Sequence, residues 1–167
     1  MRRAGARQLN ILAAQGNLAS TFQKLGRREQ ALQMREEILA GCRKLYGEEA
    51  EGTLLAALNC ATSLGGLHRF EESKVLLRKT ISVAQRVLGE GHDLTLRMRW
   101  CHAMTLYDHP AATLYDLRES VATLEELGRT VRRVLGGAHP LTMQLEISLQ
   151  KARATLRARE TPSPGSS

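Results

Sequence analysis

The sequence is poor in several residue types, and each shortage excludes a class of protein. Phe, Trp and Tyr together make up 4% of the 167 residues, too few for a typical β-sandwich core. Proline occurs only four times, which leaves most of the chain free to be helical. No apolar run approaches the roughly 18 residues that a membrane-spanning helix needs. The composition therefore favours a helical protein, and we expect no membrane partner.

The common motifs of catalysis and metal binding are missing as well. Cys42, Cys60 and Cys101 form no CxxC pair, and neither an HExxH motif nor a phosphate-binding glycine loop occurs. Cys101 and His102 are adjacent, so on a helix their side chains point about 100° apart, unlike a cooperating thiol and base. We therefore expect no enzymatic activity, no metal and no cofactor. The cysteines are interpreted as reduced, buried thiols of a cytoplasmic protein.

Acidic residues are absent from the first 28 positions, which carry six Lys or Arg residues. In charge alone this segment resembles an organellar transit peptide, so organellar targeting is the alternative to a cytoplasmic location. From Leu9 onward, however, the segment already fits the first repeat, and we interpret only residues 1–8 as a basic extension. At the other end, the small residues of 159–167 predict a disordered tail.

What the sequence does contain is a repeat of about 42 residues. Ala19, Ala61 and Ala103 are 42 positions apart, and a glycine followed by a threonine closes each unit. A period of this size is typical of solenoids, in which each unit buries its apolar face only against its neighbours. A binding surface is therefore expected before a catalytic pocket. The closing pairs are Gly47 with Thr53, Gly89 with Thr95, and Gly136 with Thr142.

Each unit divides into two amphipathic helices. In the first unit, one apolar stripe covers residues 12–25 and a second covers 31–45, and Gly26 and Gly47 follow them. Glycine past a helix predicts a left-handed C-cap, because only glycine adopts positive φ without cost. The third unit is five residues longer, and Pro110 should end its first helix. We predict one repeat domain over residues 9–158, with units at about 12–53, 54–95 and 96–142 and a capping helix at about 139–158.

Small residues recur at two positions of the units, one in each helix. Helix axes that pack 8–10 Å apart need such gaps, so both positions are predicted to lie at close helix–helix contacts. The first-helix position holds Ala19, Ala61 and Ala103, and the second-helix position holds Ala31, Ser73 and Ser120.

These features bring out a family resemblance. Asn17-Leu18-Ala19, followed by LGRREQAL at residues 25–32, resembles a tetratricopeptide repeat. The 42-residue unit is longer than the usual 34 and resembles the kinesin light chain variety, whose units end in Leu-Gly, then His, then Thr. Residues 88–95 and 135–142 match that ending, whereas Ala50 stands where the first unit would have histidine.

The resemblance implies an all-α fold, a right-handed superhelical stack of antiparallel helix pairs that ends in a C-terminal capping helix. Such an α-solenoid binds a protein or peptide on its concave face. Kinesin light chains carry a heptad coiled coil before their repeats, and this sequence shows none, so motor association is not implied.

The family also implies where a ligand would bind, because the first helix of each unit lines the concave groove. Asn17 and Asn59 match the family's asparagine, which can hydrogen-bond a peptide backbone, with helix-to-helix hydrogen bonding as the alternative. The third unit has Cys101 there. Trp100 is a candidate for the groove and equally for packing against a neighbouring helix. The predicted partner-binding residues are Asn17, Ser20, Lys24, Leu58, Asn59, Thr62, Arg97, Trp100, Met104 and Tyr107.

Charge is unevenly distributed, since the first 47 residues hold nine basic and three acidic side chains. A basic first unit favours an acidic peptide or a nucleic acid, and a solvated helix face is the alternative. Few aromatics interleave with the basic residues, so the stacking platform of a single-strand binder is missing. The predicted function is a non-catalytic adaptor that binds an extended or helical partner segment. The alternatives are a basic repeat protein that binds nucleic acid and a fragment of a longer repeat array.

Overall fold

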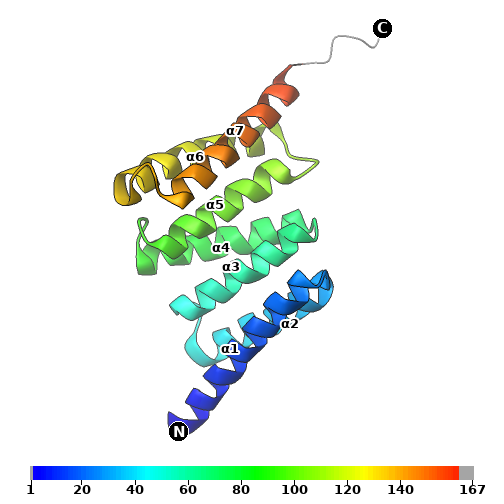
Figure 1. Cartoon of the computed structure of the whole chain (residues 1–167), viewed down its shortest axis with the longest axis vertical. Helices are drawn as coiled ribbons and strands as arrows, with labels where there is room; N and C mark the ends of the chain where they lie inside the picture. The colour runs from blue at the N-terminus through cyan, green and yellow to red at the C-terminus, as the bar shows by residue number, and fades with distance from the viewer. Residues whose placement is uncertain (1, 162–167) are drawn as a thin grey trace. The chain divides into compact units, whose positions relative to one another are not determined.

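The computed structural model describes the backbone of residues 2–161, with side chains from Ile11 onward except at positions 13 and 135. Over that range the chain forms seven α-helices and no strand (Figure 1). None of these helices combines the length and the apolar character that a membrane span requires. The helices are α1 (Arg2–Lys24), α2 (Arg28–Tyr46), α3 (Glu51–Gly66), α4 (Phe70–Leu88), α5 (Asp93–Asp108), α6 (Leu114–Leu135) and α7 (Pro140–Glu160).

The period seen in the sequence is also the period of the helices. The 19 residues of α4 begin and end 42 positions after those of α2, and the 16 residues of α5 do the same relative to α3. Two of the five extra residues of the third repeat lengthen the turn before α6, and the other three make α6 longer than α4, with 22 residues against 19. At the start of α6, the Thr113 hydroxyl accepts a hydrogen bond from the Asp116 amide, and the Asp116 carboxylate accepts one from the Thr113 amide. This reciprocal cap starts α6 after the turn that contains Pro110.

The chain forms two compact units, Met1–Thr95 and Leu96–Ser167. In the first unit α2 packs against α1 and α3, and α3 packs against α4. Its core cluster combines aliphatic, alanine and cysteine side chains from α1, α2 and α3. These core residues are Leu12, Leu32, Leu39, Cys42, Ala56, Ala57, Cys60 and Leu64.

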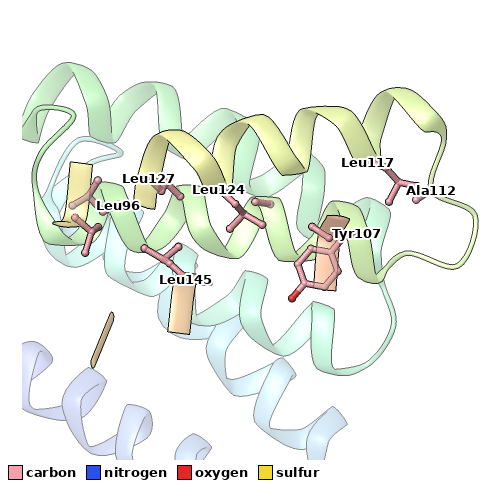
Figure 2. Close-up of a cluster of buried hydrophobic side chains, with 10 residues drawn as sticks. Leu96, Tyr107, Ala112, Leu117, Leu124, Leu127 and Leu145 are labelled. Carbon is pink, nitrogen blue, oxygen red and sulfur yellow. The ribbon is translucent and has the colours of Figure 1, made fainter. Parts of the chain in front are cut away.

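In the second unit α6 packs against α7. Its core joins the inner faces of α5, α6 and α7 with Ala112 from the turn before α6 (Figure 2). The buried residues of this cluster are Leu96, Ala103, Tyr107, Ala112, Leu117, Leu124, Leu127, Val131, Leu145 and Ala152.

The glycines that close the units have positive φ, as predicted. Gly47, Gly89 and Gly136 have φ of 85°, 91° and 85°. Their ψ values of 171°, 160° and 163° differ from the predicted left-handed helical conformation, because they place each glycine in the extended region that essentially only glycine occupies. His68 also has positive φ, 60°, at the repeat position equivalent to Gly26. The second 42-residue repeat therefore uses histidine in a turn where the first repeat uses glycine.

The predicted domain limits differ slightly from the helix limits. The α1 helix begins at Arg2 and so includes most of the predicted basic extension, and α7 continues to Glu160, beyond the predicted limit of 158. The rest of the predicted tail, residues 162–167, lies outside the described residues. A single repeat domain over 9–158 stays a prediction.

The first small-residue position lies at close contacts, as predicted, because Ala19, Ala61 and Ala103 have no exposed surface. At the second position, Ala31, Ser73 and Ser120 are buried as well. The small side chains therefore lie inside the helix pairs.

Candidate partner-binding groove

A cavity opens between the first three helices of the first unit. Its volume is about 320 Å³, and its wall is mostly apolar. It is lined by Leu12, Gly16 and Ser20 from α1, by Arg35, Ile38, Cys42 and Tyr46 from α2, and by Gly52, Leu55, Ala56 and Asn59 from α3. Tyr46 and Leu55 are more than two-fifths exposed, so large apolar side chains at the cavity remain in contact with solvent.

A second hollow of about 240 Å³ lies between the same three helices. Its lining is more polar and includes Gln23 of α1, Arg28 and Ala31 of α2, and Ser63 and Gly66 of α3. The two hollows follow one another along α2 and α3. We call them together the first-unit groove.

Two arginines of α2 reach across the first-unit groove to α3. Arg35 Nη1 donates to the Asn59 carbonyl at 3.3 Å and also to the Ser63 hydroxyl. Arg28 Nη1 donates to the Gly66 carbonyl at 3.2 Å. Arg35 is half-buried, and burial lowers the pKa of its guanidinium.

The repeat explains why the groove exists in this unit. Arg28 and Arg35 belong to the first 42-residue repeat, and the second and third repeats fill the same positions with buried apolar side chains, three of which have no exposed surface. An arginine keeps its charged group near water and fills such a position less completely, so space remains beside it. The equivalents are Phe70 and Leu117 for Arg28, and Leu77 and Leu124 for Arg35.

Four of the predicted site residues lie on α1 and α3 around this groove, and two of them line its cavity. Ser20 and Asn59 do so, and Ser20 donates its hydroxyl to the Gly16 carbonyl at 3.0 Å. Asn17 and Thr62 are exposed, and the Thr62 hydroxyl donates to the Leu58 carbonyl at 2.9 Å.

Two further predicted residues of the first unit lie elsewhere. Leu58 is 5% exposed and belongs to the buried interior, so its side chain is not at the surface of the groove in this structure. Lys24 is exposed at the end of α1.

The predicted residues of the second unit pack largely against its own core. The Trp100 indole donates Nε1–H to the Ser148 hydroxyl of α7 at 3.0 Å, and Met104 packs on the same cluster. Tyr107 is 8% exposed, and burial raises the pKa of its phenol. Arg97 is exposed on α5. The structure thus places Trp100 against a neighbouring helix, one of the two roles that the sequence left open, and partner binding by these residues stays a prediction.

The groove also contains residues that the sequence analysis did not select. Arg28, Arg35, Ile38 and Tyr46 come from α2, a second helix, whereas only first helices were expected to contribute. The sequence signal that could have revealed them is the repeat itself, because Arg35 stands where the other two repeats have Leu77 and Leu124.

The first-unit thiols are unsuited to nucleophilic chemistry. Cys42 and Cys60 are buried, as predicted, while Cys101 is partly exposed. Burial raises the pKa of Cys60 to about 11, with the Glu36 carboxylate adding to the shift, and it raises the pKa of Cys42 too. Both thiols are therefore protonated at neutral pH, and a protonated thiol is a poor nucleophile.

The histidines near the ends of the repeats act as helix caps. His92 Nδ1 accepts a hydrogen bond from the Leu94 amide at 3.3 Å, and His139 Nδ1 accepts one from the Leu141 amide at 3.2 Å. Ala50, which stands in the histidine position of the first unit, gives α3 no side-chain cap. Among the described residues, no three His, Cys, Asp or Glu side chains are grouped so that they could hold a metal ion.

Comparison with known proteins shows what the repeat is similar to. Residues 10–85 match the tetratricopeptide repeat family. The nearly identical TPR-like repeats assigned to a kinesin light chain of Podosopora anserina match this structure with a TM-score of 0.78 at 20% identity, over 86% of this chain and 66% of that one. BtubC (BKLC) from P. vanneervenii matches with a TM-score of 0.57 at 17% identity, over 93% and 68%. No curated protein sequence matches the chain.

The chain thus spans just under two thirds of the Podosopora anserina chain. The predicted all-α fold of antiparallel helix pairs and the resemblance to kinesin light chain repeats are both confirmed. Repeats of this fold generally serve as protein-interaction scaffolds.

Proposed function

We propose that the chain is a tetratricopeptide repeat protein of the kinesin light chain-like type and that it is a non-catalytic adaptor. Its first-unit groove binds an extended or helical segment of a partner protein. The single observation that carries this proposal is the apolar cavity between α1, α2 and α3.

Three properties of the cavity support a peptide as its occupant. Its volume of about 320 Å³ is at the small end of ligand sites and is large enough for one or two side chains. Exposed apolar residues, Tyr46 and Leu55, line it, so a bound apolar side chain would cover surface now in water. The amide of Asn59 and the hydroxyl of Ser20 supply hydrogen-bonding groups for a peptide backbone.

Nucleic acid is less well supported as a partner. Binding to phosphates needs cations that are free to neutralise them. Five Lys or Arg side chains in the described part of the compact unit Met1–Thr95 instead pair with glutamates, and one of them, Arg43, belongs to the basic first 47 residues. These five are Arg43, Arg69, Lys74, Lys79 and Arg86.

Selection from a displayed library of random 12-residue peptides tests the proposal. The full chain is the target, and the affinity of a selected synthetic peptide is then measured by fluorescence polarisation. Leu55→Glu replaces apolar surface that a bound side chain would cover by a carboxylate that must lose water on binding, so we expect it to weaken binding at least tenfold.

Val75→Glu is the matched control, since Val75 is an apolar residue of α4 that is 67% exposed and outside the groove. It should leave the affinity unchanged, and both variants should keep the helical circular dichroism spectrum. Failure to select any peptide, or an equal loss of affinity in both variants, would refute the proposed function.

A further inference from the structure

The face of α7 opposite its buried side chains is apolar and exposed to solvent. Met143 is 58% exposed and Ile147 is 53% exposed. Ala154 and Ala158 continue the same face towards the end of the helix and are exposed as well. At 100° per residue, the four side chains lie within about 60° of one another around the helix axis, so they form one stripe. We call these four residues the α7 stripe.

The repeat shows that the equivalent face of the earlier first helices is covered. The α7 helix begins 47 positions after α5, and α5 begins 42 positions after α3, so the three helices are equivalent. Met143 and Ile147 therefore stand at positions that are buried or partly buried in both earlier helices. The equivalents are Leu54 and Leu96 for Met143, which are 1% and 3% exposed, and Leu58 and Trp100 for Ile147.

An apolar outer face is unusual for a helix with no further helix packed on it. The terminal repeats of a solenoid normally have a polar outer face, which keeps the protein soluble. The exposure of Met143 and Ile147 shows that no described helix covers the α7 stripe. A second apolar helix that packs on the stripe would remove this surface from water.

The order of side chains along the α7 stripe makes it complementary to a second copy of itself. The two large side chains come first and the two alanines last, at intervals of four, seven and four residues. These intervals are the same in both directions. When two α7 helices pack antiparallel, with the two-fold axis between residues 150 and 151, Met143 of each copy faces Ala158 of the other and Ile147 faces Ala154. A large side chain opposite a small one allows helix axes to approach to about 8–10 Å.

Charge favours the same arrangement. Glu146 and Arg157 lie on one flank of the stripe, and Arg157 has no carboxylate partner among the described residues, whereas Glu146 pairs with Arg132. In the antiparallel pair, each Arg157 lies about 3 Å along the axis from Glu146 of the other copy, so two symmetric ion pairs can form. The two Lys151 side chains lie near the two-fold axis, where the neighbouring Asp108 of each chain offsets their charge.

We propose that the α7 stripe is a self-association surface that joins two copies of the chain in an antiparallel dimer. The stripe lies on the second compact unit, so this inference does not rest on the proposed function. A single helix pair buries less than the roughly 1,600 Å² of a standard stable interface, so the dimer is weak and depends on concentration. It carries two first-unit grooves, and a partner with two binding segments would gain affinity through avidity.

Sedimentation equilibrium of the full chain between about 10 µM and about 1 mM tests the association. We expect a monomer–dimer equilibrium. Ile147→Glu places a carboxylate in the apolar contact and should weaken the dimer at least tenfold. Val75→Glu is the matched control, because Val75 is an exposed apolar residue of α4 outside the stripe, and it should leave the dissociation constant unchanged. Circular dichroism verifies the fold of both variants. A chain that stays monomeric throughout, or an equal effect of both variants, would overturn the proposal.

Disulfide cross-linking tests the antiparallel register. All variants carry Cys101→Ser, because Cys101 is the partly exposed native cysteine. When Met143→Cys and Ala158→Cys are mixed and oxidised, we expect a disulfide between the two variants. Neither should cross-link with itself, since its two copies lie about 22 Å apart along the helix axes, whereas a disulfide joins Cα atoms less than about 7 Å apart.

The cross-linking outcomes decide what covers the stripe. Cross-linking of Met143→Cys with itself would indicate a parallel pair and would overturn the proposed register. The absence of any cross-link between the two variants would overturn the dimer and assign the stripe to a different protein or to residues 162–167 of the same chain.

Discussion

The Ser73 hydroxyl donates a hydrogen bond to the main-chain carbonyl of Ala61, at 3.0 Å, and so connects α4 to α3 inside the second helix pair. The third pair repeats the contact, with Ser120 donating to the Ala103 carbonyl at 2.8 Å. The two small-residue positions of the repeat therefore face each other. In the first pair the equivalent residue is Ala31, which has no hydroxyl to donate.

Removing this contact should destabilise the chain. Ser73→Ala deletes a buried donor and is expected to lower the free energy of unfolding by about 1 kcal/mol. Ala31→Ser introduces the hydroxyl opposite Ala19 and should raise that free energy by about 0.5 kcal/mol, because burial of the new group offsets part of the gain. Urea unfolding followed by circular dichroism measures both.

Ser82→Ala is the control for this pair, since the Ser82 hydroxyl is exposed and donates within its own helix to the Arg78 carbonyl. Its effect should stay within about 0.5 kcal/mol. Equal destabilisation by Ser73→Ala and Ser82→Ala would show that the interhelical hydrogen bond adds no more to the free energy of unfolding than a hydrogen bond within one helix.

Trp100 is expected to be a structural residue of the second unit. Its indole packs on the core cluster and donates to Ser148, so Trp100→Ala should lower the free energy of unfolding by about 3 kcal/mol. Trp100→Phe removes the hydrogen bond and keeps most of the packing, so it should cost about 1 kcal/mol. Urea unfolding measures both variants.

A double-mutant cycle isolates the hydrogen bond between these side chains. Ser148→Ala should cost less in the Trp100→Phe background than in the unaltered chain, because one of its two partners, the Trp100 indole, is already absent while Tyr107 remains. If Trp100→Ala instead abolished peptide binding at unchanged stability, the groove role that the sequence suggested for this residue would be restored.

Cys60 should make stability depend on alkaline pH. Burial raises the pKa of its thiol from 9.0 to about 11, so between these values the folded chain holds a proton that the unfolded chain has lost. Ionisation then favours the unfolded state, and stability falls as pH rises from about 9 towards 11. At pH 10.5 this loss should amount to roughly 2 kcal/mol.

Cys60→Ala provides the comparison, because lysines, tyrosines and the other cysteines titrate in both proteins. Urea unfolding at pH 8 and at pH 10.5 gives the decrease in stability for each, and the decrease should be roughly 2 kcal/mol smaller in Cys60→Ala. The same decrease in both would show that the Cys60 thiol does not keep its proton through folding.

The helices could be predicted because their signals are local. Apolar stripes at helical spacing and glycines after α2, α4 and α6 define the elements without knowledge of the tertiary structure. The ψ of Gly47 could not be predicted in that way, since the left-handed and the extended conformations both require positive φ. His68 shows the same limit, because histidine gives no sequence signal for positive φ.

The site was harder to predict than the fold because it depends on which face of a helix is buried. Leu58 and Asn59 are neighbours, and a rotation of about 100° separates the buried side chain from the exposed one. Arg35 lies in the same register as Leu77, yet only the structure shows that Leu77 is fully buried. A residue that departs from the repeat, such as Arg35, can be recognised as a candidate site residue only when the burial of the equivalent positions is known.

The central claim is that the first-unit groove binds a partner peptide, and amide chemical shifts of the isotope-labelled chain test it most directly. On titration with a peptide selected from the library, the largest shift changes should fall on residues that line the cavity, such as Gly16, Ile38 and Asn59. Helices α6 and α7 should change little. Largest changes around Trp100 and Ser148, with the cavity residues unperturbed, would contradict the claim and place binding in the second unit.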